Sequence, residues 1–394
     1  MTGRYDEALV AYGEAMAIHA ASDVVAHARV QRKTGLVQQL RGKANEALAT
    51  FDDVLARLPP EATSERVRVL LNIADLQFRR GNADIAIGHL SKVLTLGERA
   101  RDDEAIAEAL KLLGTVYSYR GELARALDHQ QRSLEAYVRI DDALAEANLH
   151  NNIGRTERRR SRHAAALNSY ATSLAIRERI GDQLGRVHSH VNIAEIHFLR
   201  ADLEEAQRHY SIALEIATSI GYALGAGAAV IGLGATNVAR GDALKGIAQL
   251  RDAIADFERD GQRTLMVEAL RDLTDGYIAI RSPLAMSTGE RGVALARALA
   301  LPELLAIALQ TLGAACIAEG DVERGTAALE EARGLLTGGD DRHELGRTFA
   351  LLARAYASLP VSDPRHAKAD GVRADARAIL EELGAVLDLH RLVP

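Results

Sequence analysis

The sequence predicts an all-α fold, an α-solenoid of antiparallel helix pairs with about nine full hairpins and a half repeat at the N-terminus. Three observations predict it. Turn residues recur every 39 or 40 residues along the 394-residue chain. Small and larger side chains keep a fixed distance from each turn, as in repeat arrays. The composition favours helix, because the chain has only seven prolines and is rich in Ala, Leu, Arg and Glu.

The turn positions set the phase of the array. Most are glycine or another small residue, and several follow an arginine. They are Gly3, Gly42, Gly81, Gly121, Ser161, Ala201, Gly241, Arg281, Gly320 and Pro360. A constant phase over the whole chain indicates one repeated structural unit, a hairpin of two helices.

Two ladders of side chains predict how the helices of each hairpin pack. Seven residues before the turn, a small residue allows close approach: Gly35, Ala74, Gly114, Gly154, Ala194, Gly234, Thr274, Gly313 and Ala353. Five residues after the turn comes a second small residue, as in Ala47 and Ala86, and four further on a larger one: Tyr12, Phe51, Leu90, Gln130, Tyr170, Tyr210, Leu250, Glu290 and Leu329. The seventh hairpin is degenerate, with Arg281, Met286 and Glu290 at these positions. One hairpin cannot bury its own apolar face, so neighbours are expected to stack.

No long Gly/Ser-rich or Pro-rich linker interrupts the array, so the sequence predicts one domain over residues 1–394. Its parts are a half repeat in 1–22, repeats in 23–357, and a degenerate last helix with a C-terminal tail in 358–394. Gly3 already occupies a turn position, so the chain is expected to start at a second helix. That helix is either a natural cap or the sign of a fragment of a longer protein.

Composition and charge indicate which partners and which cellular compartment to expect. A net charge of −6 gives no reason to expect a nucleic acid partner or an anionic membrane surface. No apolar run is long enough to span a membrane, and the N-terminus lacks a signal-peptide core. The single cysteine, Cys316, cannot form an intrachain disulfide. We therefore expect a cytoplasmic protein.

The sequence contains no motif for catalysis, a cofactor or a metal. There is no GxSxG motif, no phosphate-binding loop and no plausible Cys/His pair. The densest histidine group is His188, His190 and His197. Residues two apart on a helix point about 200° apart, so His188 and His190 cannot share a metal without distortion. We expect no enzymatic activity, no cofactor and no metal site.

The repeat resembles the tetratricopeptide repeat. The resemblance is carried by the small residue of the first helix, the turn, and the alanine and aromatic residue of the second helix, as in Gly154, Ala166 and Tyr170. The period exceeds the usual ~34 residues and is similar to the long repeats of kinesin light chains, LGN-type polarity adaptors and bacterial signalling proteins. The resemblance implies a right-handed superhelix whose first helices line a concave groove.

Candidate binding residues lie on those first helices. Asparagines recur at equivalent places as Asn72, Asn152 and Asn192. A primary amide both donates and accepts hydrogen bonds, so the row can hold a peptide backbone. The alternative is that these asparagines bond to the neighbouring repeat and fix its stacking. With charged and amide neighbours, the expected peptide-binding set is Asn72, Lys111, Asn148, Asn152, Arg155, Arg159, Asn192 and Glu195.

The sixth hairpin differs, because its predicted groove face is almost wholly apolar. This face comprises Ala228, Ile231, Gly232, Ala235, Val238 and Ala239. Five glycines crowd the same segment, and each costs a helix roughly 1 kcal/mol relative to alanine. We expect a soft point here, where the apolar patch holds a hydrophobic anchor of a ligand or the chain's own tail.

The sequence thus favours a non-enzymatic interaction module that binds a peptide or protein segment in its groove. The alternative is the sensory or regulatory part of a larger bacterial signalling or transcription-regulatory protein. A protein or peptide is the expected partner, with no nucleic acid and no membrane. The sequence does not predict the oligomeric state.

Overall fold

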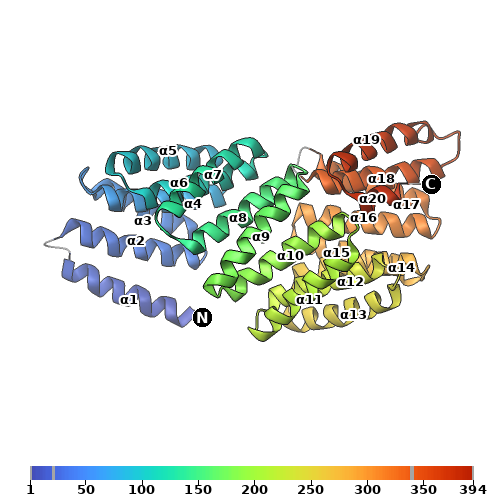
Figure 1. The fold of residues 1–394 in the computed structure, drawn as a ribbon, viewed down its shortest axis with the longest axis horizontal. Helices are drawn as coiled ribbons and strands as arrows, with labels where there is room; N and C mark the ends of the chain where they lie inside the picture. The colour runs from blue at the N-terminus through green and yellow to red at the C-terminus, as the bar shows by residue number, and fades with distance from the viewer. Residues whose placement is uncertain (1, 20–22, 338–340, 393–394) are drawn as a thin grey trace. The chain divides into compact units, whose positions relative to one another are not determined.

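A computed structural model describes residues 2–19, 23–337 and 341–392. Over these residues the chain forms α-helices and one short 3₁₀ helix, with no strand (Figure 1). The all-α prediction is confirmed. The chain divides into two compact units, Met1–Thr156 and Glu157–Pro394, and the boundary falls inside helix α8.

Within the described residues, nine helical hairpins follow one leading helix, α1 (Thr2–His19). Their first helices are α2 (Val24–Leu40), α4 (Thr63–Arg79), α6 (Asp103–Tyr119), α8 (Ala143–Arg159), α10 (Gln183–Leu199), α12 (Ala223–Ala239), α14 (Arg263–Ala279), α16 (Pro302–Ala318) and α18 (Arg342–Ser358). Their second helices are α3 (Ala44–Arg57), α5 (Ala83–Ala100), α7 (Leu123–Arg139), α9 (His163–Ile180), α11 (Leu203–Ser219), α13 (Ala243–Asp260), α15 (Leu284–Leu299), α17 (Val322–Leu336) and α19 (Ala369–Glu382). The expected number of hairpins is confirmed.

The turns fall where the sequence places them, except at the two ends. Eight turn residues, from Gly42 at 77° to Gly320 at 89°, adopt positive φ, and one of them is the non-glycine Ser161 at 62°. Such a φ reverses the chain between two helices within two or three residues. Gly3 is different, because it lies inside α1 and forms no turn. In the last hairpin, the chain runs through Pro360 and a 3₁₀ turn, His366–Lys368, before α19 begins at Ala369.

The two ladders meet inside several hairpins, which explains their spacing. A Cβ added at Gly35 would lie 2.5 Å from the Phe51 ring, and one at Gly313 would lie 2.6 Å from Leu329 Cγ. The larger residue of the second helix therefore fills the space left by the small residue of the first. Phe51, Leu90, Leu250 and Leu329 are at most 1% exposed. Tight contacts of this kind leave little room for a longer side chain.

The seventh hairpin is built like the others but is shifted by one residue. The repeat spacing predicts Met286 and Glu290 on the second-helix ladder, and this prediction is wrong. Ala285 and Gly289 are buried there instead, whereas Glu290 is exposed. The shift arises because the turns at Arg281 and Gly320 are 39 residues apart, one fewer than in most hairpins. The shorter segment is accommodated at the start of α15, where a tight turn forms and Ala285 N donates a hydrogen bond to Ser282 O. A missing residue at the start of the helix moves every later side chain back by one position.

In α12, large neighbours fill the space beside four glycines. Cβ atoms added at Gly225, Gly227, Gly232 and Gly234 would lie 2.3–2.8 Å from side chains of Tyr222, Val187, Leu265, Tyr210 and Leu250. These glycines therefore allow close packing, which opposes the expected soft point. We predict that amides of Gly221–Gly241 exchange hydrogen as slowly as those of Ala145–Arg160, measured by mass spectrometry on the full chain. Exchange at least tenfold faster would support the hinge expectation instead.

Candidate functional site

The main cavity of the Glu157–Pro394 unit lies on the face made by its first helices. Within this unit, α12, α14, α16 and α18 pack side by side in that order. They enclose about 520 Å³ together with α20 (Val386–Arg391), a short helix near the C-terminus. The apolar lining residues are Val238, Ala239, Ile278, Ala279, Ala314, Ala350, Leu351 and Leu387, and the polar ones are Asp275, Gln310, Thr311, Arg347, Arg354, Asp388 and His390.

Charges converge at one end of this cavity. The Arg347 guanidinium lies 3.6 Å from a Glu344 oxygen, 3.8 Å from Asp275 and 3.6 Å from Asp388. Glu344 and Asp388 are buried. Burial favours the neutral form of Glu344, but Arg347, His343 and Arg271 together hold the pKa of this carboxyl below its usual value. Arg347 therefore compensates three carboxylates at once.

The C-terminal helix α20 contributes two neighbouring residues to this face. The Asp388 carboxylate lies 2.8 Å from His343 Nε2 as well as near Arg347. Leu387 lines the same cavity as Val238 and Ile278. The apolar patch of the sixth hairpin thus lies beside the chain's own tail, one of the two occupants that the sequence predicted. The face accommodates an apolar side chain next to a carboxylate.

Five of the eight residues proposed from the sequence belong to the Met1–Thr156 unit. Asn72 is half-buried and accepts a long 3.5 Å hydrogen bond from Arg32. Lys111 donates to Glu108 at 2.5 Å and lies over the Tyr137 ring. Asn148 and Arg155 are exposed, and Asn152 is half-buried. Lys111 is therefore partly engaged inside its own unit.

The other three belong to the Glu157–Pro394 unit. Glu195 accepts a 2.8 Å hydrogen bond from Arg158, and Asn192 is half-buried. Arg159 lines a smaller cavity of about 260 Å³ with Arg158, His163, Leu199, Asp341, Arg342, His343, Glu344, Leu383 and Ala385. Burial and nearby cations lower the pKa of His163. Cations thus outnumber carboxylates around Arg159.

None of the eight residues lines the 520 Å³ cavity, which lies in hairpins six to nine. Yet Arg155 and Glu195 share a repeat position with three residues that do. Six residues before the turn, the later hairpins carry Asp275, Ala314 and Arg354. Extending this one row along the sequence would have found part of the cavity lining. The repeat position six residues before the turn identifies one face of the first helix, but it does not predict which hairpins leave open space.

The asparagine row changes character along the chain. Its equivalents in hairpins six to eight are Gly232, Asp272 and Thr311, and all three are buried. Gly232 packs directly against Tyr210 of the preceding hairpin. At Gly232 the position serves stacking, which is the alternative that the sequence left open, whereas Thr311 lines the 520 Å³ cavity. The half-buried asparagines of the earlier hairpins remain candidates for binding a peptide backbone.

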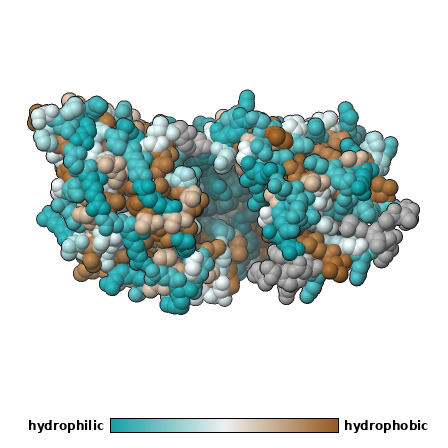
Figure 2. Space-filling view, turned by 180° about the vertical axis from the view of Figure 1, so that it is seen from behind, coloured by the Kyte–Doolittle hydropathy of each residue, from teal (hydrophilic) through white to brown (hydrophobic). Residues whose placement is uncertain are grey.

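The face of the molecule in Figure 2 carries both hydrophobic and hydrophilic residues. Exposed large hydrophobic side chains such as Leu40, Leu244 and Val361 stand far apart in the sequence. Among the described residues, no helix is long and apolar enough to cross a membrane.

Comparisons with known proteins agree with this architecture. The family model for the tetratricopeptide repeat matches residues 65–139, 121–179 and 145–219. The search of curated proteins found no match. The helical hairpins thus define a repeat array, and the ladder continues on both sides of the matched region. Over residues 65–219 the chain is similar to the tetratricopeptide repeat family.

Several solved structures share the fold at low sequence identity. A Rap protein complexed with competence and sporulation factor is 16% identical, with a TM-score of 0.59 over 90% of this chain and 99% of that chain. The Rap conjugation gene regulator of plasmid pLS20, in complex with the Phr* peptide, is 15% identical, with a TM-score of 0.56 over 86% and 97%. A STAND protein with a tetratricopeptide repeat sensor from Pyrococcus horikoshii is 18% identical, with a TM-score of 0.57 over 84% and 52%.

Proposed function

We propose that this chain is a non-enzymatic module that binds a peptide or protein segment on the first-helix face of its Glu157–Pro394 unit. One observation carries the proposal: the 520 Å³ cavity combines an apolar wall with cationic groups. The tail already places Leu387 and Asp388 against this face. The preferred ligand is therefore a segment in which an apolar residue adjoins a carboxylate.

Arg354 supplies a charge that a ligand can use. It lines the cavity, is exposed, and has no ion pair among the described residues. A guanidinium at the edge of an apolar cavity suits a ligand carboxylate, which it can bind through two parallel hydrogen bonds. Ile278 and Leu351 provide the adjoining apolar wall. The Rap structures solved with competence and sporulation factor and with the Phr* peptide support a peptide-binding role.

The test is selection of 12-residue peptides from a phage library on the full chain, followed by affinity measurement with synthetic peptides. Ala314→Arg fills the cavity and should weaken binding about tenfold or more, equivalent to ~1.4 kcal/mol. Thr115→Arg is the matched control, because Thr115 holds the same repeat position in the other unit and is exposed. It should leave the affinity unchanged.

The asparagine row is tested in the same assay with Asn152→Ala/Asn192→Ala. If this pair abolishes binding while Ala314→Arg does not, the ligand binds the asparagine row and the cavity proposal is wrong. If no peptide saturates the wild-type chain, the peptide-binding function itself is refuted. Circular dichroism of each variant would verify that the helices remain folded.

A regulatory role within a larger signalling protein is the second candidate. The favouring observation is the similarity to the STAND protein, in which the tetratricopeptide repeats form a sensor. In that role, peptide binding would change the activity of an attached domain. Purifying the native protein and measuring its mass would test this candidate, which requires additional sequence beyond the present 394 residues.

A further inference from the structure

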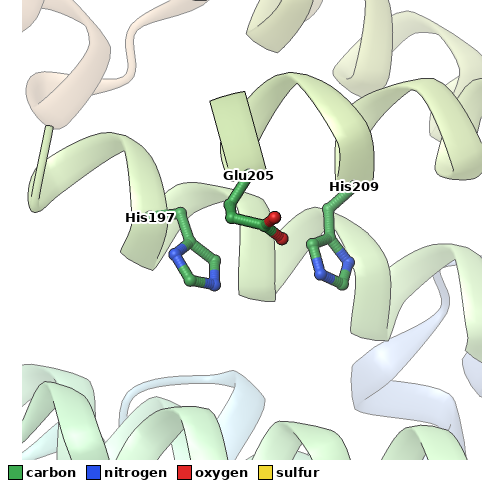
Figure 3. A group of neighbouring side chains, drawn as sticks. All are labelled: His197, Glu205 and His209. Atoms are coloured by element: carbon green, nitrogen blue, oxygen red, sulfur yellow. The ribbon is translucent and has the colours of Figure 1, made fainter. Parts of the chain in front are cut away.

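Two histidines and a glutamate converge across the hairpin of α10 and α11. His197 comes from α10, whereas Glu205 and His209 come from α11. Their potential ligand atoms all lie within 4.8 Å of one another. Figure 3 shows the Glu205 carboxylate between the two imidazole rings in that view. Glu205 and His209 are one helical turn apart, so both point toward the same side of α11.

The Nδ1 atom of each imidazole, His197 and His209, lies close to a neighbouring side chain. His197 Nδ1 lies 3.4 Å from Asp202 Oδ2, and His209 Nδ1 lies 2.9 Å from His190 Nδ1. Metal-binding histidines usually have such an outer partner, because it fixes the tautomer and the orientation of the ring. With Nδ1 engaged, the Nε2 atoms of His197 and His209 are available as ligands.

A cation already lies at part of this cluster. The Arg208 guanidinium donates to Glu205 Oε2 at 2.7 Å and to His209 Nε2 at 2.9 Å. The carboxylate and the imidazole therefore direct their lone pairs at one positive charge. Arg208 is 55% exposed and can turn into solvent. Its guanidinium occupies the place that a smaller cation would take.

We propose that His197, Glu205 and His209 bind a divalent first-row transition metal, with Zn²⁺ as the reference ion. Two imidazoles and one carboxylate are a ligand set that zinc sites use, with a fourth position open to water. Ligand bonds of about 2.0–2.2 Å require the three atoms to approach by roughly 1 Å. The exposed Glu205 carboxylate can do this by rotating. The metal would join α10 to α11 across their turn.

Histidine spacing within one helix does not reveal this site. His188 and His190 lie on α10 and point apart, so the spacing within this single helix predicts no metal site. The site depends on His209 and Glu205, which lie on the next helix. It is also separate from the cavity proposed to bind peptide, since none of its three residues lines that cavity. It can therefore be tested independently.

The experiment titrates the full metal-free chain with Zn²⁺ by calorimetry and with Co²⁺ by visible absorption. The wild type should bind one ion per chain, and Co²⁺ should give the d–d bands of a site with nitrogen ligands. Glu205→Gln, at an exposed position, and His197→Ala should each weaken Zn²⁺ binding about 10–100-fold or more, at least the loss seen for outer-shell changes. His188→Ala is the matched control and should change nothing, because His188 is exposed and packs on Tyr222.

Arg208→Gln removes the competing guanidinium and should strengthen Zn²⁺ binding several-fold. The proposal is overturned if the wild type gives no saturable one-to-one binding, or if His197→Ala and Glu205→Gln bind as tightly as His188→Ala. Weaker binding by Arg208→Gln would also contradict it, because the guanidinium would then not be a competitor. If His197→Ala disturbs folding, because His197 is half-buried, Glu205→Gln still tests the site.

Discussion

Replacing Arg347 by methionine is expected to lower the free energy of unfolding of the Glu157–Pro394 unit by about 3–5 kcal/mol. Methionine keeps much of the volume but removes the charge that faces Glu344, Asp275 and Asp388. Glu344 and Asp388 are at most 7% exposed. Buried carboxylates without a compensating cation are strongly unfavourable, and that loss dominates the effect.

Arg342→Met is the matched control for this prediction. Arg342 lies on the same helix and pairs with Glu382, but both side chains are about half exposed. Such surface pairs contribute about 0–1 kcal/mol. Urea unfolding followed by circular dichroism would give the two free energies. Hydrogen exchange would also report whether α20 is released in the Arg347 variant, as the loss of its contact with Asp388 predicts. Equal destabilisation by both substitutions would contradict the role of Arg347.

Acidification should reduce the cost of Arg347→Met. In the wild type the pKa of Glu344 is lowered, so its contribution is present at neutral pH and is lost as the pH falls through that lowered pKa. Without Arg347, burial should raise the pKa of Glu344 above its unfolded value. The variant then gains stability relative to the wild type as the pH falls toward about 4–5. A difference between the two proteins that stays constant from pH 7 to pH 5 would contradict this explanation.

The hairpins could be predicted from the sequence because tight packing constrains the residues that form them. The turn at Gly121 and the contact of Gly114 with Gln130 each tolerate few side chains, so they recur at a fixed spacing. The one-residue shift in the seventh hairpin escaped prediction because Arg281 keeps the turn position while the deletion follows it. The deletion is not apparent in the sequence, because Met286 falls at the expected ladder position and nearly fits it.

The proposed binding face is harder to predict, because open space imposes no packing pattern on the residues around it. Arg354 and Asp275 share a row with Arg155 and Glu195, yet the cavity exists only where the later hairpins and α20 leave room. The tail's Asp388 belongs to no repeat, so no periodicity points to it. Likewise, the proposed metal site requires His197 and His209 from different helices to meet, and a search within one helix cannot find that.

Replacing Gly246 by alanine is expected to lower the free energy of unfolding by about 1–3 kcal/mol, the usual cost of overpacking. Six other hairpins carry alanine at this position when the shifted Ala285 is included, so the repeat consensus predicts the opposite, a gain of about 1 kcal/mol. The structure decides against the consensus. A Cβ at Gly246 would lie 2.6 Å from the carbonyl oxygen of Gly234 and 2.8 Å from Val238 Cγ2. A backbone atom cannot move aside as a flexible side chain can.

Gly88→Ala separates this steric cost from the general effect of replacing a helical glycine. Gly88 lies inside α5, and a Cβ there would meet no atom within 4 Å. This control should stabilise the chain by about 0.4–1 kcal/mol, through reduced freedom of the unfolded state. Urea unfolding of both variants measures the difference. If Gly246→Ala is as stabilising as Gly88→Ala, the two helices of the sixth hairpin can separate at little cost. If Gly246→Ala destabilises the chain and Gly88→Ala stabilises it, Gly234 and Gly246 together allow the two helices to approach more closely than in the alanine-containing hairpins.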